Sequence, residues 1–395
     1  MTKTQTSFMK NFLLSTTLFV TLILGYSSCS KNKLPDDDNG KGTDTTVTVV
    51  NHAQHLSYYV DTSGNDNNDG LSPSKPWKTL AKVSSTTFVP GDKIFLKSGQ
   101  VWNENLYPLG SGNADSLITL GKYGGDSRPI INGTGTSEVP ALKLADQSYW
   151  EISGLEITNK STTDNALLRG ISVSGSDASQ STHIYITNCF IHDVQSASLK
   201  SAVYNKINGG IIFTGPVSNI LVKGCHIKDC LITGIRTAST PLVSSVVIDS
   251  NLIENVYGDG IVLAGVKDSS KIIRNVLRNV CYSPESANFA GAWTIRSSKT
   301  LIAYNEVSGI TGGGVNDGQP FDSDLDTDGD VFEYNYTHDN KKGFILLMPS
   351  AKNVVVRYNL SIRDNGVATG YQRRRLINNT SSSTGTLFHN NTFVI

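Results

Sequence analysis

The residues that suggest chemistry are three aspartates that alternate along a short stretch, Asp322, Asp324 and Asp326. If this stretch is a β-strand, the three side chains lie on one face, about 7 Å apart. Carboxylate oxygens at this spacing suit a hard cation, and Ca²⁺ is the cofactor that they would hold. Alternatively, two of them form a carboxyl pair in which one group protonates a leaving oxygen and the other activates water or attacks a sugar. A third interpretation is a solvated acidic loop with no chemical role.

Four further side chains are candidates for contacting a substrate. Arg236 and Arg296 have the charge and planar shape to hold an anionic group. The indole of Trp293 has an apolar face on which a sugar ring could pack. His338 precedes Asp339 and is a candidate acid or base beside an orienting carboxylate. The structural alternatives are a buried indole at position 293 and a turn cap at 338–339.

These residues lie within a repeat. Short apolar runs precede an asparagine, and a second short run follows it, as in Tyr304-Asn305-Glu306-Val307. The asparagines at this position recur at nearly regular intervals along the chain: Asn251, Asn275, Asn305, Asn335 and Asn359. A unit this small cannot bury its own apolar face, so successive units must stack. We therefore expect parallel coils in which the asparagines form one hydrogen-bonded line.

Stacked coils predict an all-β solenoid rather than another β architecture. A β-sandwich does not require one residue type at a repeating position, and a β-propeller needs longer, four-stranded units. Thr294 follows Asn275 at the same interval as Asp324 follows Asn305, which predicts that 293–296 align with 323–326. If Ile295 and Leu325 point inward, then Thr294, Arg296 and the three aspartates point outward, on the same sheet face as Arg236.

The repeat resembles the pectate-lyase-like right-handed parallel β-helix superfamily, in particular its exported bacterial members. The resemblance covers residues 57–395. It is carried by the coil series and by five segments: Tyr58-Tyr59-Val60-Asp61, Gly64 to Gly70, Pro76-Trp77-Lys78-Thr79-Leu80, Pro90-Gly91-Asp92-Lys93-Ile94 and Tyr149 to Ile157. It implies one domain, a single-stranded right-handed parallel β-helix that acts on or binds polysaccharide. This fold carries several activities, so the function must be argued from the site.

Three functions stay open on this basis. Resemblance to the lyases implies Ca²⁺-assisted β-elimination, with the metal on Asp322, Asp324 and Asp326 and with Arg296 or Arg236 removing the C5 proton, although free arginine is a weak base. The second is glycoside hydrolysis by an aspartate pair on the same face. The third is a non-catalytic glycan-binding or adhesion solenoid. In each case the expected partner is a polysaccharide, and we expect a monomer.

The N-terminal segment predicts export. Lys3 and Lys10 precede an apolar run from Phe12 to Gly25, and Ser27-Ser28-Cys29 follows it, as in a bacterial lipoprotein signal. We expect residues 1–29 to be that signal, with lipid on Cys29, and residues 30–56 to be a flexible tether. The expected product is an outer-membrane lipoprotein, at the cell surface or the periplasmic face, whose only contact with the membrane is its lipid. An ordinary signal peptide with an incidental cysteine is the alternative.

Composition narrows the class of partner. The chain has 34 acidic and 34 basic residues, which removes the electrostatic basis for binding nucleic acid. Charged residues make up 17% of the chain and glycine is abundant, at 36 residues, as in a β-rich globular protein. Because Phe393-Val394-Ile395 stands within a strand pattern, we also expect that the domain continues beyond it.

Overall fold

The described part of the chain is a stack of parallel strands. The computed structural model describes residues 55–395 except 199–205, 284–287, 315–316, 365–374 and 381. The predicted signal, Cys29 and most of the tether lie outside the described residues. Within those residues the one helix is α1 (Leu80–Ser84), and none is long and apolar enough to cross a membrane.

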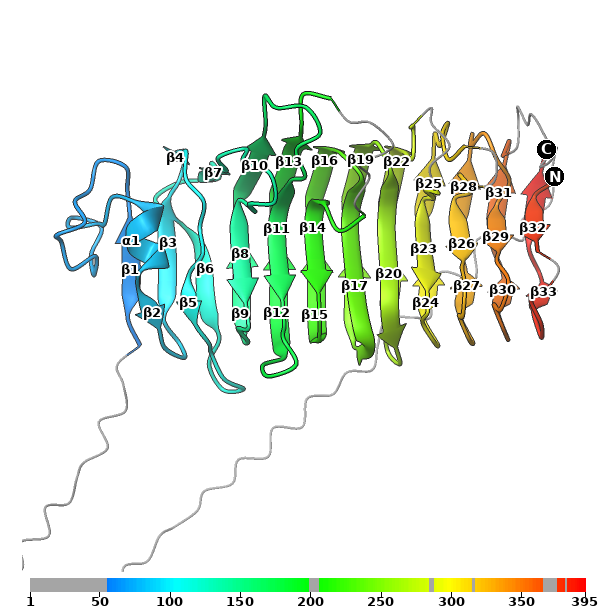
Figure 1. Cartoon of the computed structure of the whole chain (residues 1–395), viewed down its shortest axis with the longest axis horizontal. Coiled ribbons are helices and arrows are strands. Elements are labelled where there is room, and N and C mark those ends of the chain that lie inside the picture. The colour runs from blue at the N-terminus through cyan, green and yellow to red at the C-terminus, as the bar shows by residue number, and fades with distance from the viewer. Residues whose placement is uncertain (1–54, 199–205, 284–287, 315–316, 365–374, 381) are drawn as a thin grey trace, which may run out of the picture. The chain divides into compact units, whose positions relative to one another are not determined.

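Three sheets run side by side along the stack, each built from strands of successive coils (Figure 1). In the described residues the first sheet has 12 strands: β1 (Ser57–Val60), β3 (Lys93–Lys97), β6 (Ile118–Tyr123), β9 (Trp150–Ser153), β12 (Ser181–Thr187), β15 (Val217–Lys223), β18 (Val246–Asp249), β21 (Lys271–Ile273), β24 (Leu301–Ala303), β27 (Val331–Glu333), β30 (Val355–Arg357) and β33 (Leu387–His389). The second sheet has 11 strands within the same ranges: β4 (Val101–Trp102), β7 (Ile130–Asn132), β10 (Glu156–Lys160), β13 (Phe190–Gln195), β16 (His226–Cys230), β19 (Leu252–Val256), β22 (Val276–Val280), β25 (Glu306–Ser308), β28 (Tyr336–His338), β31 (Leu360–Ile362) and β34 (Thr392–Val394).

The third sheet has nine strands in the described part of the chain: β8 (Leu142–Ala145), β11 (Arg169–Ser174), β14 (Gly209–Thr214), β17 (Thr233–Ser244), β20 (Asp259–Lys267), β23 (Ala292–Ile295), β26 (Phe321–Ser323), β29 (Ile345–Leu347) and β32 (Ile377–Asn379). A small sheet of β2 (Thr87–Phe88) and β5 (Leu109–Gly110) lies outside these three. The strands of each coil pair in parallel with those of the next, so each sheet repeats the same positions from coil to coil.

The core is built from the inward residues of these repeats. In the first sheet one inward position is occupied on successive coils by aligned, fully buried side chains: Ile186, Val222, Ile248, Ile272, Ile302, Phe332 and Val356. β-Branched side chains suit this position because they pack well on a pleated surface. Burial of such rows is the main favourable contribution to the stability of the stack.

The predicted line of asparagines is confirmed. The backbone N–H of Asn275 and its side-chain Nδ2 both donate to Oδ1 of Asn305, at 2.9 and 3.0 Å. Asn305 bonds Asn335 in the same way, at 3.0 Å for both contacts. The line starts at Asn251 and runs through Asn359 to Asn391. Each Nδ2 also donates to a main-chain carbonyl of the first sheet, such as that of Ile272. The buried amides are therefore fully paired.

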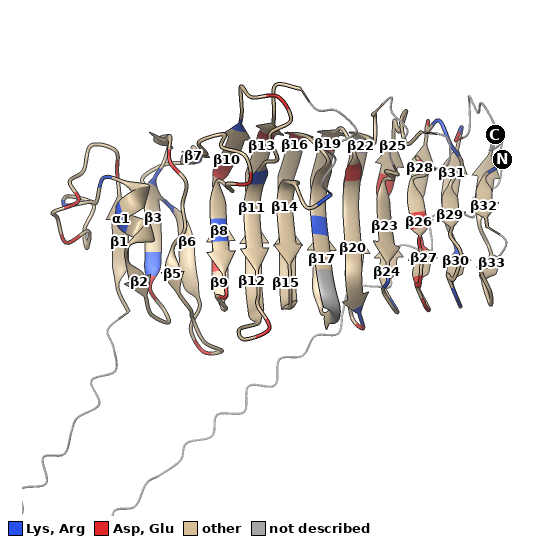
Figure 2. Ribbon diagram, viewed as in Figure 1, with Lys and Arg blue, Asp and Glu red and all other residues tan. Residues whose placement is uncertain are grey.

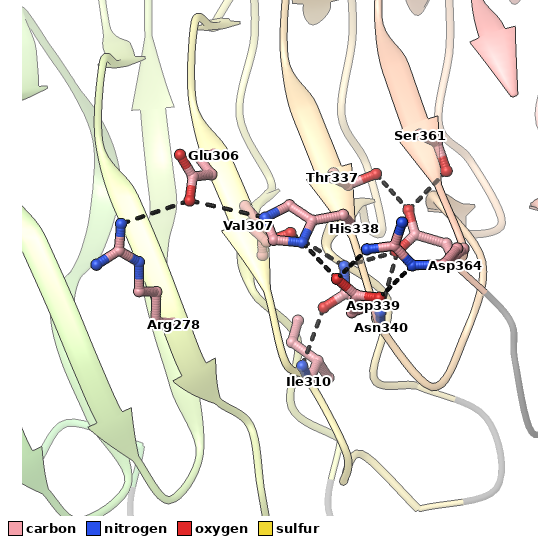
Figure 3. A network of polar contacts seen from close by, with 11 residues as sticks. Arg278, Glu306, Val307, Ile310, Thr337, His338, Asp339, Asn340, Ser361 and Asp364 are labelled. Carbon is pink, nitrogen blue, oxygen red and sulfur yellow. Dashed lines mark hydrogen bonds and ion pairs between the residues drawn. The ribbon is translucent and has the colours of Figure 1, made fainter. Parts of the chain in front are cut away.

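A second, shorter row of hydrogen-bonded polar side chains follows the strands of the second sheet, whereas the asparagines precede these strands (Figure 3). The sequence did not suggest this second row. Asn340 donates from its backbone and its side chain to Oδ1 of Asp364, at 3.1 and 2.8 Å. The hydroxyls of Thr337 and Ser361 donate to the other carboxylate oxygen. Burial raises the pKa of Asp364, and these donors oppose the shift.

We predict that Asn305→Ala lowers the free energy of unfolding by about 2–4 kcal/mol, because it leaves buried groups on both neighbouring coils without partners. Denaturant unfolding measures this loss. Asn103→Ala is the matched control, since exposed Asn103 makes one side-chain hydrogen bond, to Asn132. Its expected effect is within about 0.5 kcal/mol. Equal losses in the two variants would contradict a stabilising role for the line.

Candidate active site

A pocket of about 270 Å³ opens on the outer face of the third sheet. Its lining combines three carboxyl groups, two cations and several apolar side chains: Lys206, Arg236, Asn288, Phe289, Ala290, Trp293, Ile295, Asp317, Asp322, Asp324, Leu325 and Met348. Figure 2 shows charged residues on the strands of this sheet, basic on β17 and acidic on β20 and β26. Of the predicted site residues, the pocket brings together Arg236, Trp293, Asp322 and Asp324.

One outward row of the third sheet forms the floor of the pocket. Arg236, Val262, Trp293 and Asp322 are successive partners across β17, β20, β23 and β26. The predicted alignment of Thr294 with Asp324 is wrong by one position, because Thr294 pairs with Ser323. The reason is that the segment from Asn305 to Ser323 is one residue shorter than the segment from Asn275 to Thr294.

The predicted orientation of Thr294 was also wrong. Thr294 is fully buried inside the coil and donates to Asp330 at 2.6 Å. Trp293 and Ile295, which have the opposite parity, pack together on the outer side, and Leu325 lines the pocket at 40% exposure. The prediction placed bulky apolar side chains inward, but here the apolar walls of the pocket give them partners on the outer face.

The buried Asp259 holds Arg236 and Trp293 in place at the pocket through direct contacts. The carboxylate of Asp259 is completely buried and accepts hydrogen bonds from Trp293 Nε1 at 2.9 Å and from the backbone N–H of Ala290 at 3.0 Å. It also forms an ion pair with Nη1 of Arg236 at 3.5 Å. The Arg236 guanidinium lies over the Trp293 ring, 5.5 Å from its centroid, and Lys206 lies over the same ring at 5.4 Å. Asp259 therefore fixes a cation and an aromatic ring of the pocket together.

The three carboxyl groups of the pocket have raised pKa values. Burial raises the pKa of Asp317 to about 6, and the charge of Asp324 adds to this shift. Burial raises the pKa of Asp322 well above its ordinary value, and Asp324 and Asp317 add to it. The Oδ1 of Asp322 is buried without a hydrogen-bond partner among the described residues, which fits a protonated carboxyl. Both observations favour the neutral form of the Asp322 carboxyl.

Asp324 has a raised pKa as well, but several of its neighbours stabilise the ionised form. Burial raises its pKa, but the backbone N–H of Leu325 donates to its Oδ1 at 2.7 Å and lowers the pKa, as do the charges of Lys206 and Arg296. Asp324 is also less buried than Asp322. The surroundings of Asp324 therefore differ from those of Asp322, because they add a hydrogen bond and two positive charges that stabilise the ionised form.

Asp317 was not among the predicted site residues. It ends a glycine-rich loop, and the structure explains those glycines. At Gly313, where φ is +85°, an added Cβ would lie 2.3 Å from the Cα of Gly318. At Gly318, where φ is +104°, it would lie 2.4 Å from the carbonyl oxygen of Gly312. The loop closes on itself at these points and directs Asp317 into the pocket. A run of glycines beside an aspartate was the sequence signal that could have indicated it.

Two predicted site residues beside the pocket do not line it. Arg296 is exposed, at φ +48°, and its backbone N–H donates to the carbonyl of Leu325 at 2.8 Å. Asp326 is exposed at φ +58°, beyond the end of β26. In the described residues no group of three or more His, Cys, Asp and Glu side chains is arranged to hold a metal ion. Asp326 does not line the pocket that Asp322 and Asp324 share, so the structure does not bring the three predicted Ca²⁺ ligands together there.

His338 lies on β28 of the second sheet (Figure 3) and does not line the pocket. Its Nδ1 is 2.7 Å from Asp339 and its Nε2 is 3.7 Å from Glu306, which also pairs with Arg278. Arg363 holds Asp339 through two bonds of 2.7 and 2.8 Å and lowers the pKa of that carboxyl. The pairs His338–Glu306 and Arg363–Asp339 link consecutive coils, so His338 contributes to contacts between coils.

We predict that Asp322→Asn changes how stability depends on pH. Because the pKa of Asp322 is raised in the folded state, the folded protein keeps a proton that the unfolded chain loses, and stability falls as pH rises from the unfolded pKa through the folded one. The asparagine variant lacks this term. Its urea midpoint should exceed that of the wild type at pH 8, and the advantage should shrink toward pH 4. A constant difference at all pH values would show that Asp322 is not protonated.

Comparison with known proteins supports the architecture. Residues 130–286 match the family model described as right handed beta helix region. A lacto-N-biosidase from Bifidobacterium longum subsp. longum is 26% identical over 90% of this chain, and the chain spans 28% of that protein's length. The crystal structure of a GH136 lacto-N-biosidase from Eubacterium ramulus has 23% sequence identity and a TM-score of 0.73, covering 86% of this chain and 68% of that one. The chain therefore has the right-handed parallel β-helix fold that its resemblance to the pectate-lyase-like superfamily predicts.

Proposed function

We propose that this protein is a glycoside hydrolase in which Asp317 and Asp324 are the two catalytic carboxyl groups. The observation that carries the proposal is the presence, in one pocket, of two carboxyl groups in contrasting surroundings. Glycoside hydrolysis needs one group that gives a proton to the leaving oxygen and another that is ionised. Surroundings that stabilise the ionised form of one carboxyl more than that of the other suit this division of roles.

Asp317 suits the role of general acid. Its pKa of about 6 keeps a fraction of the group protonated near neutral pH. Asp324, supported by the N–H of Leu325 and by two nearby cations, suits the role of nucleophile or base. Burial raises the pKa of the neighbouring Asp322 and so favours its neutral form, which adds no charge to the pair.

The charges of the pocket favour hydrolysis over β-elimination. A lyase must neutralise the carboxylate of a uronate and needs a base for the C5 proton. Here the Arg236 guanidinium is already paired with the buried Asp259, and Lys206 faces the carboxyl groups. The negative charges of Asp324 and ionised Asp317, which line the pocket, repel a uronate. A neutral sugar fits this balance.

The apolar part of the pocket suits the face of a sugar ring. Phe289, Ile295, Leu325 and Met348 line it beside Trp293, and polar groups for hydrogen bonds stand among them. The two relatives named above are lacto-N-biosidases, which makes a lacto-N-bioside the first substrate to test. The chain covers less than a third of the curated relative, so this substrate is part of the proposal.

We expect Asp317→Asn and Asp324→Asn each to lower kcat on a chromogenic lacto-N-bioside at least about 1000-fold, because each removes a group that acts in the transition state. Asp322→Asn is the matched control and should keep activity within about tenfold, because an amide resembles the neutral carboxyl. Release of reducing ends without unsaturated, ultraviolet-absorbing ends identifies hydrolysis. Glycan binding without turnover in the wild type would instead indicate a binding solenoid.

The pH profile gives a separate check. The general acid must be protonated, so kcat/KM should fall as pH rises through about 6, the pKa of Asp317. At low pH the rate should fall again as Asp324 becomes protonated. Addition of a chelator should leave the profile unchanged. A rate that rises steadily above pH 7, or that requires calcium, would favour elimination.

A further inference from the structure

Lys342 lies beneath the loop that carries Asp317, in the turn between β28 and β29 on the next coil. Its ammonium group donates to the main-chain carbonyl of Gly314 at 2.8 Å and to that of Asp317. The side chain is 9% exposed and does not line the pocket. Lys342 therefore binds the glycine-rich loop through two main-chain carbonyls, on the side of the loop away from the pocket.

The groups around Lys342 determine which charges act on its ammonium group. On one side lies the buried Cys281, whose main-chain carbonyl accepts from Gly312 N–H at 2.7 Å. Burial raises the pKa of that thiol well above its ordinary value, so the thiol is uncharged. Lys341, the neighbouring cation, is exposed, and its backbone N–H donates to the carbonyl of Ile310 at 2.8 Å. The Asp317 carboxylate is the anionic group whose charge favours the ammonium form of Lys342.

We propose that Lys342 is a positioning residue for Asp317: its ammonium group fixes the loop through two carbonyls, and its charge favours ionisation of the Asp317 carboxyl. This inference rests on the proposed function for its kinetic consequence, but its structural part does not need it. Charge-assisted hydrogen bonds are among the stronger ones in proteins, and two of them restrain the main chain on either side of 315–316. A displacement of about 1 Å in a catalytic group can cost about 100-fold in rate.

The direction in which Lys342 changes the pKa of Asp317 follows from its charge. The charge of Lys342 lowers the pKa of Asp317, against the burial that raises it to about 6. Removal of that charge should raise the pKa of Asp317 further. The limb of the pH profile governed by Asp317 should then move to higher pH, whether the group acts as acid or as base. A residue that serves only to stabilise the fold would lower the melting temperature without this shift.

The experiment uses Lys342→Met, Lys342→Arg and, as the matched control, Lys341→Met in the full chain. Carbon-13 NMR of the aspartate carboxyls, without substrate, gives the pKa of Asp317, which Asp317→Asn identifies by loss of its signal. We expect Lys342→Met to raise that pKa and to lower kcat on the lacto-N-bioside about 10- to 100-fold. Lys342→Arg should recover most of both, and Lys341→Met should change neither.

The wild type supplies a test that does not depend on any variant folding. Burial lowers the pKa of Lys342 to about 8, so the Asp317 signal should show a second, small inflection near that pH as Lys342 loses its proton. An Asp317 signal without that inflection, or an unchanged pKa in folded Lys342→Met, would overturn the inference. Turnover that survives Asp317→Asn would instead overturn the proposed function, while the NMR result for Lys342 would stand.

Discussion

The hydrogen-bonded line of asparagines is the constraint on which the rest of the structure depends. Each amide joins two coils and also bonds a first-sheet carbonyl, so a slip of one residue between coils would break several buried contacts at once. This fixed register aligns Arg236, Trp293 and Asp322 on the outer face of the third sheet, although they lie far apart in the chain. A strand pair prone to slipping would not hold their relative positions.

Burial does more at the pocket than hold the wall together. The same apolar surroundings that give Trp293 and Ile295 their partners also raise the pKa values of Asp317 and Asp322. Asp259, deeper still, stays compensated by Arg236 and by two N–H donors. Burial raises the pKa of all of these carboxyl groups, but each has different partners that oppose the shift. Such differences need no change in residue type, only in surroundings.

The fold could be predicted from the sequence because its signal repeats. One asparagine at a fixed position indicates little, but five in register identify a stack, and all five lie where the repeat placed them. Part of the pocket lining was predicted from the sequence. Arg236, Trp293, Asp322 and Asp324 meet in the pocket, whereas Thr294 was assigned to the wrong face and Asp317 was not selected. Both failures have local causes: one coil reaches the third sheet by a shorter segment than the coil before it, and the Asp317 loop closes through contacts between glycine backbones that no periodicity reveals.

Coil stacking also limits how such a chain can change over evolutionary time. Duplication or loss of one whole coil keeps every inter-coil contact of the same type, so a solenoid tolerates it well. The coils from β17 to β26 are an exception. A coil inserted between β23 and β26 would separate Trp293 from Asp322 by a further strand spacing, about 4.8 Å, and would open the pocket. Lengthening by repetition is therefore open to the remainder of the described stack, whereas this segment must be inherited as a unit.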